Sequence, residues 1–280
     1  MVFETKKTLN LSGSILDLST PAVMGILNLT PDSFFDGGNY LTENQMLRQT
    51  EKMFTDGAQM IDIGGASSKP NADPLSEKEE LQRILKPIER LIKAFPAIKI
   101  SVDTCSSEVA RAALEAGVCM VNDISGGDAD PQMFDLVAKR SIPYVLMHMR
   151  GTPQTMTSFT NYDNLIYEII NILQQKINSL RAMGVVDVVV DPGFGFAKSR
   201  DQNYELLRNL SYFNVLNVPI LVGISRKSMI YKTIGGTAAD ALNGTIVLNT
   251  IALMNGASIL RVHDVKEAVE AVKLYKQTYR

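Results

Sequence analysis

Polar side chains end eight short apolar runs of this chain, and their types are those that bind and transform small molecules. A carboxylate can accept two parallel N–H donors from a guanidine-like edge, and an amide offers a donor and an acceptor to a heterocycle. Arginine, lysine and histidine side chains suit phosphate instead. The eight runs end on Asn28, Asp62, Asp103, Asn122-Asp123, Met147-His148, Asp191, Ser225-Arg226-Lys227 and Arg261-His263.

The acidic and amide endings each have more than one interpretation. The stretch Asp191–Phe196 begins with a carboxylate and carries two phenylalanines that could flank a flat ring, but it could equally form a helix cap and a turn. Asp103 could be a base, a metal ligand or a stabiliser of positive charge, or it could cap the helix that begins near Ser106. Of the neighbours Asn122 and Asp123, we expect one to face a ligand and the other to be structural.

The cationic endings predict an anion site. In α/β barrels the loops after strands seven and eight often hold phosphate. The stretch Ser225–Ser228 supplies an arginine and a lysine there, with a solvated basic turn as the alternative. Alternation along the last run sends Arg261 and His263 to the same face, which favours an anion site over surface decoration. His148 is predicted to be a structural histidine with a satisfied hydrogen bond rather than a catalyst.

The spacing of these endings predicts the elements that must position them. A strand followed by a helix, repeated eight times, closes into a (β/α)8 TIM barrel in which the carboxyl ends of the strands share one mouth. Runs that are apolar at consecutive positions suit a parallel sheet covered on both sides. Residues 9–18 alternate around Gly13 and predict a short N-terminal β-hairpin that plugs the bottom of the barrel. We therefore expect an α/β fold with a single domain over residues 1–280.

Helix signals in the sequence locate two helix starts and one candidate interface. Thr42 with Gln45, and Ser76 with Glu79, each predict a capping box. The helix predicted over about residues 239–255 carries apolar side chains around most of its circumference, although the outer helix of a barrel needs only one buried face. The second apolar face favours a homodimer, and cover from neighbouring loops and the last helix is the alternative.

Composition narrows the class of protein. Hydrophobic residues make up 45% of the 280 positions and charged residues 21%, which is typical of a globular chain with a sizeable core. The net charge of −2 argues against nucleic acid as a partner, and no apolar run approaches the roughly 18 residues of a membrane helix. The start of the chain has no signal-peptide pattern, and Cys105 and Cys119 lack metal-ligand spacing, so we expect reduced thiols and a cytoplasmic location. The 2 histidines exclude a three-histidine zinc site.

Taken in order, these endings closely resemble the motifs of the dihydropteroate synthases, a family of pterin-binding barrels. The resemblance covers about residues 8–275 of the chain. Its motifs here are Met24–Phe34, Asp62–Gly65, Asp103-Thr104, Asn122–Gly127, Leu146–Met149, Asp191–Phe196, Ser225–Lys227 and Arg261–Asp264.

The resemblance implies a transferase of folate biosynthesis that takes two small-molecule substrates. It would condense 7,8-dihydropterin-6-methyl pyrophosphate with p-aminobenzoate, giving 7,8-dihydropteroate and pyrophosphate, and sulfonamides would mimic the second substrate. By family analogy the pterin is held by Asp103, Asn122, Asp191, Lys227, Met147 and Phe194, the pyrophosphate by Asn28, Arg261 and His263, and the p-aminobenzoate by Ser68, Lys69, Pro70, Phe196, Lys227 and Ser228.

The implied chemistry agrees with the residue types. Pyrophosphate leaves a methylene beside an electron-rich ring before the amine attacks, so a cation develops on the pterin. Asp103 would stabilise that cation, while Mg²⁺ held by Asn28 and the cationic residues would stabilise the leaving group. The resemblance therefore makes Asp103, Asn28 and Lys227 the expected catalytic residues, Mg²⁺ the expected cofactor and Asn28 its ligand.

The stretch after the second run departs from the family pattern. The family usually has a Glu-Ser-Thr-Arg-Pro-Gly-like sequence there, whereas this chain has Ala66–Asn71. Lys69 stands where arginine is usual, and lysine keeps the charge but loses the planar two-pronged donor. The departure bears on the anion contacts of this loop and on its handling of p-aminobenzoate or sulfonamides, unless Lys69 faces solvent.

Two other functions remain open from the sequence. A pterin-dependent methyltransferase domain resembles the same barrel, but it would have no use for the pyrophosphate site that the last two endings predict. A non-catalytic pterin-binding protein has the altered stretch at residues 66–71 as its support. Release of pyrophosphate from the two substrates distinguishes the synthase from both.

Overall fold

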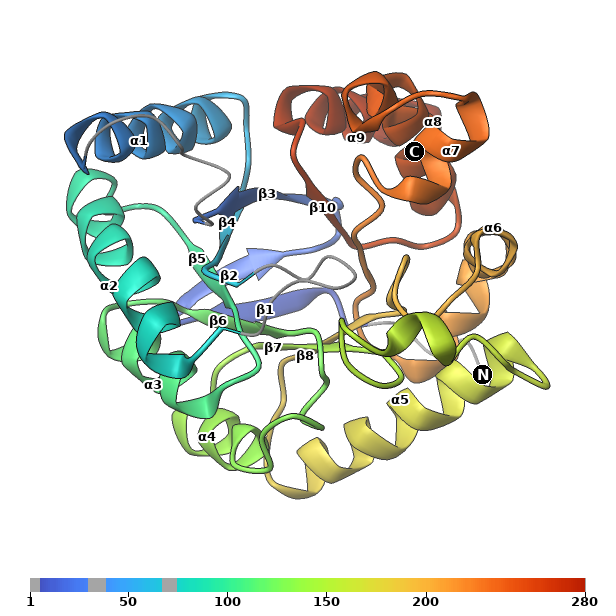
Figure 1. Ribbon diagram of the computed structural model, residues 1–280, viewed down its shortest axis with the longest axis horizontal. Coiled ribbons are helices and arrows are strands. Elements are labelled where there is room, and N and C mark those ends of the chain that lie inside the picture. The colour runs from blue at the N-terminus through green and yellow to red at the C-terminus, as the bar shows by residue number, and fades with distance from the viewer. Residues whose placement is uncertain (1–5, 30–38, 67–74, 280) are drawn as a thin grey trace.

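A barrel of parallel strands surrounded by helices forms the body of the molecule, as the sequence predicted (Figure 1). The computed structural model describes residues 6–29, 39–66 and 75–279. Within them, the strands of the barrel are β3 (Ala22–Asn28), β4 (Met60–Gly64), β5 (Ile100–Asp103), β6 (Met120–Asp123), β7 (Tyr144–Met147), β8 (Val188–Asp191), β9 (Leu221–Val222) and β10 (Ile259–Val262).

The strands follow one another around the barrel nearly in chain order. The sheet runs β8-β7-β6-β5-β4-β3-β10-β9, and a parallel bridge between Val190 and Ile220 connects its two ends. The parallel direction brings all the strand carboxyl ends to one mouth. The helices of the described residues are α1 (Asn39–Thr55), α2 (Glu77–Ala94), α3 (Ser107–Glu115), α4 (Met133–Arg140), α5 (Leu165–Ala182), α6 (Arg200–Arg208), α7 (Ser228–Ile234), α8 (Leu242–Met254) and α9 (Val265–Thr278).

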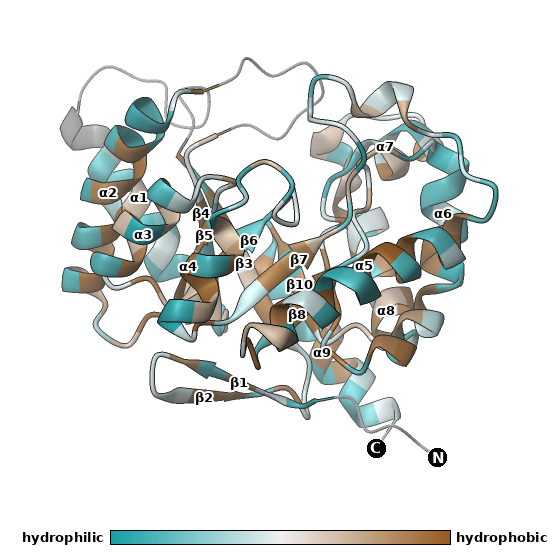
Figure 2. Ribbon diagram, turned by 90° about the horizontal axis from the view of Figure 1, so that it is seen from below, coloured by the Kyte–Doolittle hydropathy of each residue, from teal (hydrophilic) through white to brown (hydrophobic). Residues whose placement is uncertain are grey.

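An antiparallel hairpin covers the amino end of the barrel, which confirms the predicted plug. It consists of β1 (Thr8–Leu11) and β2 (Ser14–Asp17), and Figure 2 shows it lying beneath the barrel strands. Leu9 is fully buried in a cluster that includes Met24 and Met60, near the amino ends of their strands. The barrel interior is therefore closed at one end, and its polar chemistry is confined to the other.

Local capping determines only part of the helix boundaries. Ser76 and Glu79 form the predicted capping box at the start of α2. The start predicted at Thr42 is wrong, because α1 already begins at Asn39. A side-chain cap contributes only about 1 kcal/mol, so an additional turn of helix can override it.

The second apolar face of α8 is exposed in the single chain. Thr245, Asn249 and Leu253 are buried against the barrel, while 56% of Val247 and 55% of Met254 remain exposed. Cover from neighbouring elements therefore does not account for this face among the described residues. Both cysteines are free. Among the described helices none has the length and apolarity needed to cross a membrane.

Candidate active site

One arginine connects three of the polar strand endings across the mouth. Nε of Arg261, on β10, lies 2.6 Å from Oδ2 of Asp62, on β4. Nη2 of the same side chain lies 2.8 Å from Oδ2 of Asp103, on β5. Because β3 lies between β10 and β4, these contacts require all three side chains to point into the barrel. Arg261 therefore points into the barrel, on the side expected for a residue that binds a ligand.

Asp62 is the centre of this cluster and is completely buried. Its Oδ2 also accepts a hydrogen bond of 2.9 Å from Nδ2 of Asn122. The contact directs the amino group of Asn122 toward Asp62, so the amide oxygen is left as an acceptor that no described residue occupies. Asp62 was expected to end a strand but not to be part of the site. Its contacts join Arg261 and Asn122, which are distant in the sequence.

Burial and crowding of carboxylates control the protonation of Asp103. Burial raises the pKa of Asp103 to about 7, and the neighbouring carboxylates Asp62 and Glu80 add to the rise. The guanidinium of Arg261 opposes it. Asp103 therefore gains and loses a proton close to neutral pH, and its charge depends on the position of Arg261.

The neighbours Asn122 and Asp123 have separate roles, as expected. Both oxygens of Asp123 are used within the protein: Oδ2 accepts a 2.7 Å hydrogen bond from the hydroxyl of Tyr144 and one of 2.9 Å from the N–H of Gly127, and Oδ1 accepts one of 2.7 Å from the N–H of Ser125. Asp123 therefore stabilises the turn after β6, and Asn122 is the residue that faces the mouth.

Asp191 and Lys227 lie together on the opposite side of the mouth. Burial raises the pKa of Asp191, while the charge of Lys227 and the N–H of Gly193, which donates to its Oδ1 at 2.7 Å, oppose the rise. Nζ of Lys227 donates to the carbonyl oxygen of Phe194 and lies 4.6 Å above the centre of the Phe196 ring. Burial lowers the pKa of Lys227 to about 8, an effect that Asp191 opposes.

The two residues of the cationic turn after β9 differ in function. Arg226 forms a two-pronged ion pair with Asp264, at 2.8 and 2.7 Å, and also donates to the carbonyl oxygen of Ala238 at 2.9 Å. The expectation that Arg226 supplies charge to an anion is therefore wrong, because its donors are used to join two loops. Lys227, the next residue, points into the mouth instead.

His263 is held beside this turn in its neutral form. Its Nδ1 lies 3.1 Å from Oγ of Ser225, and its own N–H donates to the same oxygen at 3.1 Å. Desolvation of the imidazole ring and the charge of Arg261 lower the pKa of His263 to about 4, although the residue as a whole is exposed at the mouth. At neutral pH the lowered pKa favours the neutral, hydrogen-bonding imidazole.

A groove beside the mouth brings residues of α1 into the site. It has a volume of about 550 Å³ and runs from Asn28 and His263 to the polar face of α1. The α1 residues were not predicted from the sequence, although Arg48 and Lys52 have the four-residue spacing that places side chains on the same helix face. The residues that line the groove are Ile26, Leu27, Asn28, Gln45, Arg48, Gln49, Lys52 and His263.

Comparisons with known proteins identify the family of this barrel. The model of a family described as pterin binding enzyme matches residues 24–263. The dihydropteroate synthase of Escherichia coli strain K12 is 41% identical over 268 residues, which cover 95% of this chain and 94% of that protein. The chain belongs to the dihydropteroate synthase family.

Solved structures of dihydropteroate synthases share the whole fold. A Yersinia pestis dihydropteroate synthase in complex with a sulfonamide drug is 41% identical, with a TM-score of 0.90 over 97% of this chain and 98% of that one. A Xanthomonas albilineans dihydropteroate synthase with 4-aminobenzoic acid is 38% identical, with a TM-score of 0.91 over 98% of each chain. The polar strand endings therefore belong to an enzyme fold that these relatives use with small aromatic ligands.

The two phenylalanines of the dihydropteroate synthase turn after β8 have different environments. Phe194 is completely buried in the core between the strands and helices, so the expectation that its ring lines the pterin slot is not supported. Phe196 instead packs with Met147 and Met156 in a separate cluster, to which the partly buried Ile124 also belongs. Strand-end alternation could not separate the two, because both lie in a turn beyond the end of β8.

Part of the expected p-aminobenzoate site is outside the described residues. Ser68, Lys69 and Pro70 belong to that part of the chain. Of the other expected contacts, Ser228 is exposed at the start of α7, directly after Lys227. Lys227 therefore contacts the turn after β8 and directly precedes Ser228 in the chain.

The donor set at the mouth suits one kind of metal ion. Within the described ranges, no three histidine, cysteine or acidic side chains are grouped as a metal site. Asn28, whose side chain carries an amide oxygen, lines the groove at the end of β3. Mg²⁺ commonly keeps several waters and takes only one or two protein oxygens together with substrate phosphates, so a single amide oxygen beside a phosphate site fits it.

Proposed function

We propose that this chain condenses 7,8-dihydropterin-6-methyl pyrophosphate with p-aminobenzoate, releasing 7,8-dihydropteroate and pyrophosphate. The observation that carries the proposal is the pair of contacts from Arg261 to Asp62 and Asp103. These contacts place a side chain that can bind an anion beside carboxylates that can bind a heterocycle. Family membership supports the same transferase reaction.

The pterin would lie against Asp191, Asn122 and Asp103. A carboxylate such as Asp191 can accept two N–H groups from the amino-pyrimidinone edge, and Asn122 offers its oxygen to a further ring N–H. Lys227 supplies a donor from the opposite direction. Met147 and Ile124, which belong to the same apolar cluster as Phe196, would cover one face of the ring.

Asp103 and Arg261 would act on the two charges that separate when the pyrophosphate leaves. The guanidinium can follow the phosphate oxygens, and the cation developing on the pterin then takes its place as the counter-charge of Asp103. A fixed carboxylate in a partly buried mouth stabilises that cation more strongly than water would. The aromatic amine attacks the methylene carbon, and neither step requires a strong general base.

Mg²⁺ is the cofactor we assign to Asn28. Bound there, it would neutralise charge on the pyrophosphate oxygens as the leaving group departs. Arg48 extends positive charge along the groove from Asn28 and His263, while Lys52, which also lines the groove, is ion-paired with Asp56. The departing pyrophosphate would therefore have a cationic path out of the mouth.

The p-aminobenzoate would bind between the turns after β8 and β9. The ring of Phe196 and the ammonium of Lys227 already lie 4.6 Å apart there, which suits an aromatic ring carrying a carboxylate. Ser228 and the stretch with Ser68, Lys69 and Pro70 would complete the pocket. This part of the proposal rests on the family resemblance of those residues.

Two further properties are part of the proposal. The chain would act as a homodimer that buries the α8 face containing Val247 and Met254, since these two large apolar side chains, about two helical turns apart, are exposed there. It would work in the cytoplasm, where the free thiols of Cys105 and Cys119 remain reduced.

Release of pyrophosphate tests the function. Wild-type protein with both substrates and Mg²⁺ should release one pyrophosphate for each dihydropteroate formed, and omission of p-aminobenzoate should abolish product formation. Pterin binding without any release would favour the non-catalytic binding protein. Methyl transfer from methyltetrahydrofolate to a corrinoid acceptor would favour the methyltransferase.

A further inference from the structure

Lys198 is a buried lysine that the reaction described above does not use. It follows the turn that begins at Asp191, and only 8% of the residue is exposed. Its Nζ donates to the carbonyl oxygens of Gly193 and Phe196, each at 3.0 Å, and lies 3.1 Å from Nδ1 of His148. An ammonium has three donors, so these three acceptors satisfy it completely.

The surroundings of Lys198 are unusual for a buried cation. None of its three hydrogen-bond partners is a carboxylate. Burial lowers the pKa of Lys198 to about 7, Asp191 opposes this, and the charges of Lys227 and Arg150 add to it. Burial and the charge of Lys198 lower the pKa of His148 to about 2, so the imidazole is neutral and can accept at Nδ1. Lys198 forms no ion pair with the residues that the structure describes, and a buried charge without an ion pair lowers the stability of the fold. Its presence therefore points to a role other than stability.

The backbone of the turn that Lys198 holds is closely packed at Gly193 and strained at Ala197. Gly193 lies close to the backbone just after β7, and a Cβ on Gly193 would lie 2.0 Å from the carbonyl oxygen of His148. Ala197 adopts a φ of 48°, in the left-handed region that residues with a side chain adopt only at an energetic cost. The conformation therefore depends on contacts from outside the turn.

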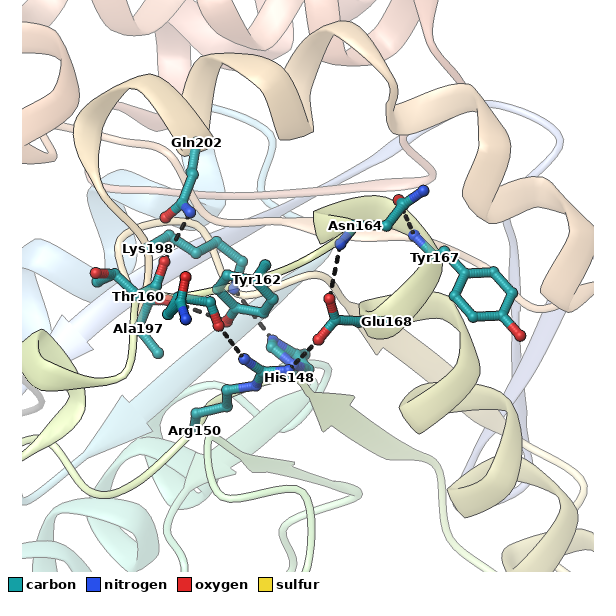
Figure 3. A network of polar contacts seen from close by, with 11 residues as sticks. His148, Arg150, Thr160, Tyr162, Asn164, Tyr167, Glu168, Ala197, Lys198 and Gln202 are labelled. Carbon is teal, nitrogen blue, oxygen red and sulfur yellow. Dashed lines mark hydrogen bonds and ion pairs between the residues drawn. The ribbon is translucent and has the colours of Figure 1, made fainter.

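A network of polar contacts joins this turn to the loop after β7 (Figure 3). The hydroxyl of Tyr162 donates to the carbonyl oxygen of Ala197 at 3.0 Å, and Nε2 of Gln202 donates to that of Thr160 at 2.7 Å. The guanidinium of Arg150 lies 3.9 Å above the ring of Tyr162. Lys198 and His148 are the buried part of this network, and they contact the turn directly.

We propose that Lys198 is a positioning residue for pterin binding, which holds the turn from Asp191 to Phe196 in its binding shape and keeps a positive charge beside the Asp191 carboxylate. The inference rests on the proposed function, since it takes Asp191 as a pterin contact. Lys198 does not touch the reacting atoms. It acts through the carbonyls of Gly193 and Phe196 and, at neutral pH and below, where it carries its proton, through its charge.

The electrostatic part of the proposal follows from the groups around Asp191. Burial favours the neutral acid there, and the groups that oppose it are Lys227, the N–H of Gly193, Arg261 and Lys198. Only the ionised carboxylate accepts two N–H donors from one ligand edge. Removing one of the three cations makes protonation of Asp191 easier, so pterin binding should weaken most at acidic pH.

The test compares pterin binding by the wild type, Lys198→Met and Tyr162→Phe. Lys198→Met removes the ammonium, while Tyr162→Phe removes one contact to the same turn and leaves every charge in place. For Lys198→Met we expect the dissociation constant for 7,8-dihydropterin-6-methyl pyrophosphate to rise about tenfold or more, the loss typical of a charged hydrogen-bond donor. The KM for p-aminobenzoate should change much less.

The pH dependence of pterin binding distinguishes two roles of Lys198: one in which its charge acts on Asp191, and one in which it only supports the structure of the turn. In Lys198→Met the acidic limit of pterin binding should move to higher pH, whereas in Tyr162→Phe it should stay where it is in the wild type. Lys176→Met is the matched control, because Lys176 also donates to a turn carbonyl, that of Gly126 at 2.9 Å, but the turn it contacts is held independently by Asp123. We expect wild-type binding from it.

Binding is measured directly so that the result does not depend on turnover. If wild-type protein binds the pterin but releases no pyrophosphate, the proposed function fails and the role of Lys198 is still tested. A folded Lys198→Met with unchanged pterin affinity and an unchanged pH limit would overturn the inference. Lys198→Gln, which keeps a donor for one carbonyl, is the second variant if Lys198→Met does not fold, and the same criteria apply to it.

Discussion

Nη2 of Arg261 lies 2.8 Å from Oδ2 of Asp103, so the residue expected to bind pyrophosphate is paired with the residue expected to stabilise the pterin cation. Asp62 shares the same guanidinium from a fully buried position. The two halves of the mouth are therefore one electrostatic unit. A ligand phosphate that attracts Arg261 also removes the counter-charge of Asp103.

Asp62→Asn should weaken binding of the pterin substrate and lower activity. The substitution keeps the size of the side chain but removes the negative charge from the group whose Oδ2 accepts from both Arg261 and Asn122. We expect kcat/KM to fall by about tenfold to a hundredfold, the range for losing a buried charge-assisted contact. Steady-state kinetics with both substrates measures it.

Ser101→Ala is the control for Asp62→Asn. Ser101 is the neighbour of Asp62 in the register between β4 and β5, and its buried hydroxyl has no hydrogen-bond partner within the described part of the chain. Removing that hydroxyl should leave kcat/KM unchanged and should not lower the melting temperature. An equal loss of activity in both variants would show that any substitution near β4 lowers activity, and that the charge of Asp62 is not the cause.

The pH profile of kcat/KM should be bell-shaped around neutral pH. Asp103, with a pKa raised to about 7, must be ionised to stabilise a cation, so activity should rise with pH through that value. Lys227, with a pKa lowered to about 8, must keep its proton to donate, so activity should fall above that value. Asp103→Asn should abolish most of the activity and remove the part of the acidic limb near pH 7, and an acidic limb that stays at the same pH would assign it to another group such as Asp191.

The stability of the wild type should depend on pH through Lys198. Its pKa is about 7 in the folded protein and near the ordinary value of 10.5 when unfolded, so between these values the unfolded chain binds more protons. Stability therefore rises with pH across this range, with a slope of up to about 1.4 kcal/mol per pH unit from this group. Urea unfolding at several pH values should show that the stability of the wild type, measured relative to that of Lys198→Met, increases as pH rises. A constant difference would contradict the lowered pKa.

Arg48→Gln should weaken inhibition by the product pyrophosphate. Arg48 lines the groove that begins at Asn28 and His263, so its charge should favour an anion leaving the mouth. We expect the inhibition constant for pyrophosphate to rise by about threefold to tenfold at low salt, and the effect should shrink as salt screens the charge. Arg208→Gln, at an exposed arginine of α6, should leave the inhibition constant at the wild-type value.

Lys69→Arg should strengthen the anion contacts of the stretch after β4. Arginine restores the planar two-pronged donor that is usual in the family at this position. The KM for p-aminobenzoate or the dissociation constant for pyrophosphate should fall, and kinetics and direct binding measure the two quantities separately. Unchanged values for both would mean that Lys69 faces solvent.

The order of strands and the residues that end them were predictable from the sequence. Consecutive β-branched and apolar residues determine a strand such as Val188–Asp191 locally, and the capping box at Ser76 marks a helix start within four residues. These patterns depend on neighbours in the chain, so the sequence alone carries them. The barrel, its mouth and the inward direction of Arg261 followed from them.

The partners of the polar side chains were decided by the tertiary structure. Arg226 and Arg261 both end barrel strands, yet one pairs with Asp264 and the other with Asp62 and Asp103. Lys198 and the α1 groove had no local pattern that revealed them as part of the mouth. A side chain's partner depends on which groups the closed barrel brings within hydrogen-bond distance. The sequence by itself therefore determined which residues reach the mouth, and only the folded barrel determined which of them are free to bind a ligand and which hold the others in place.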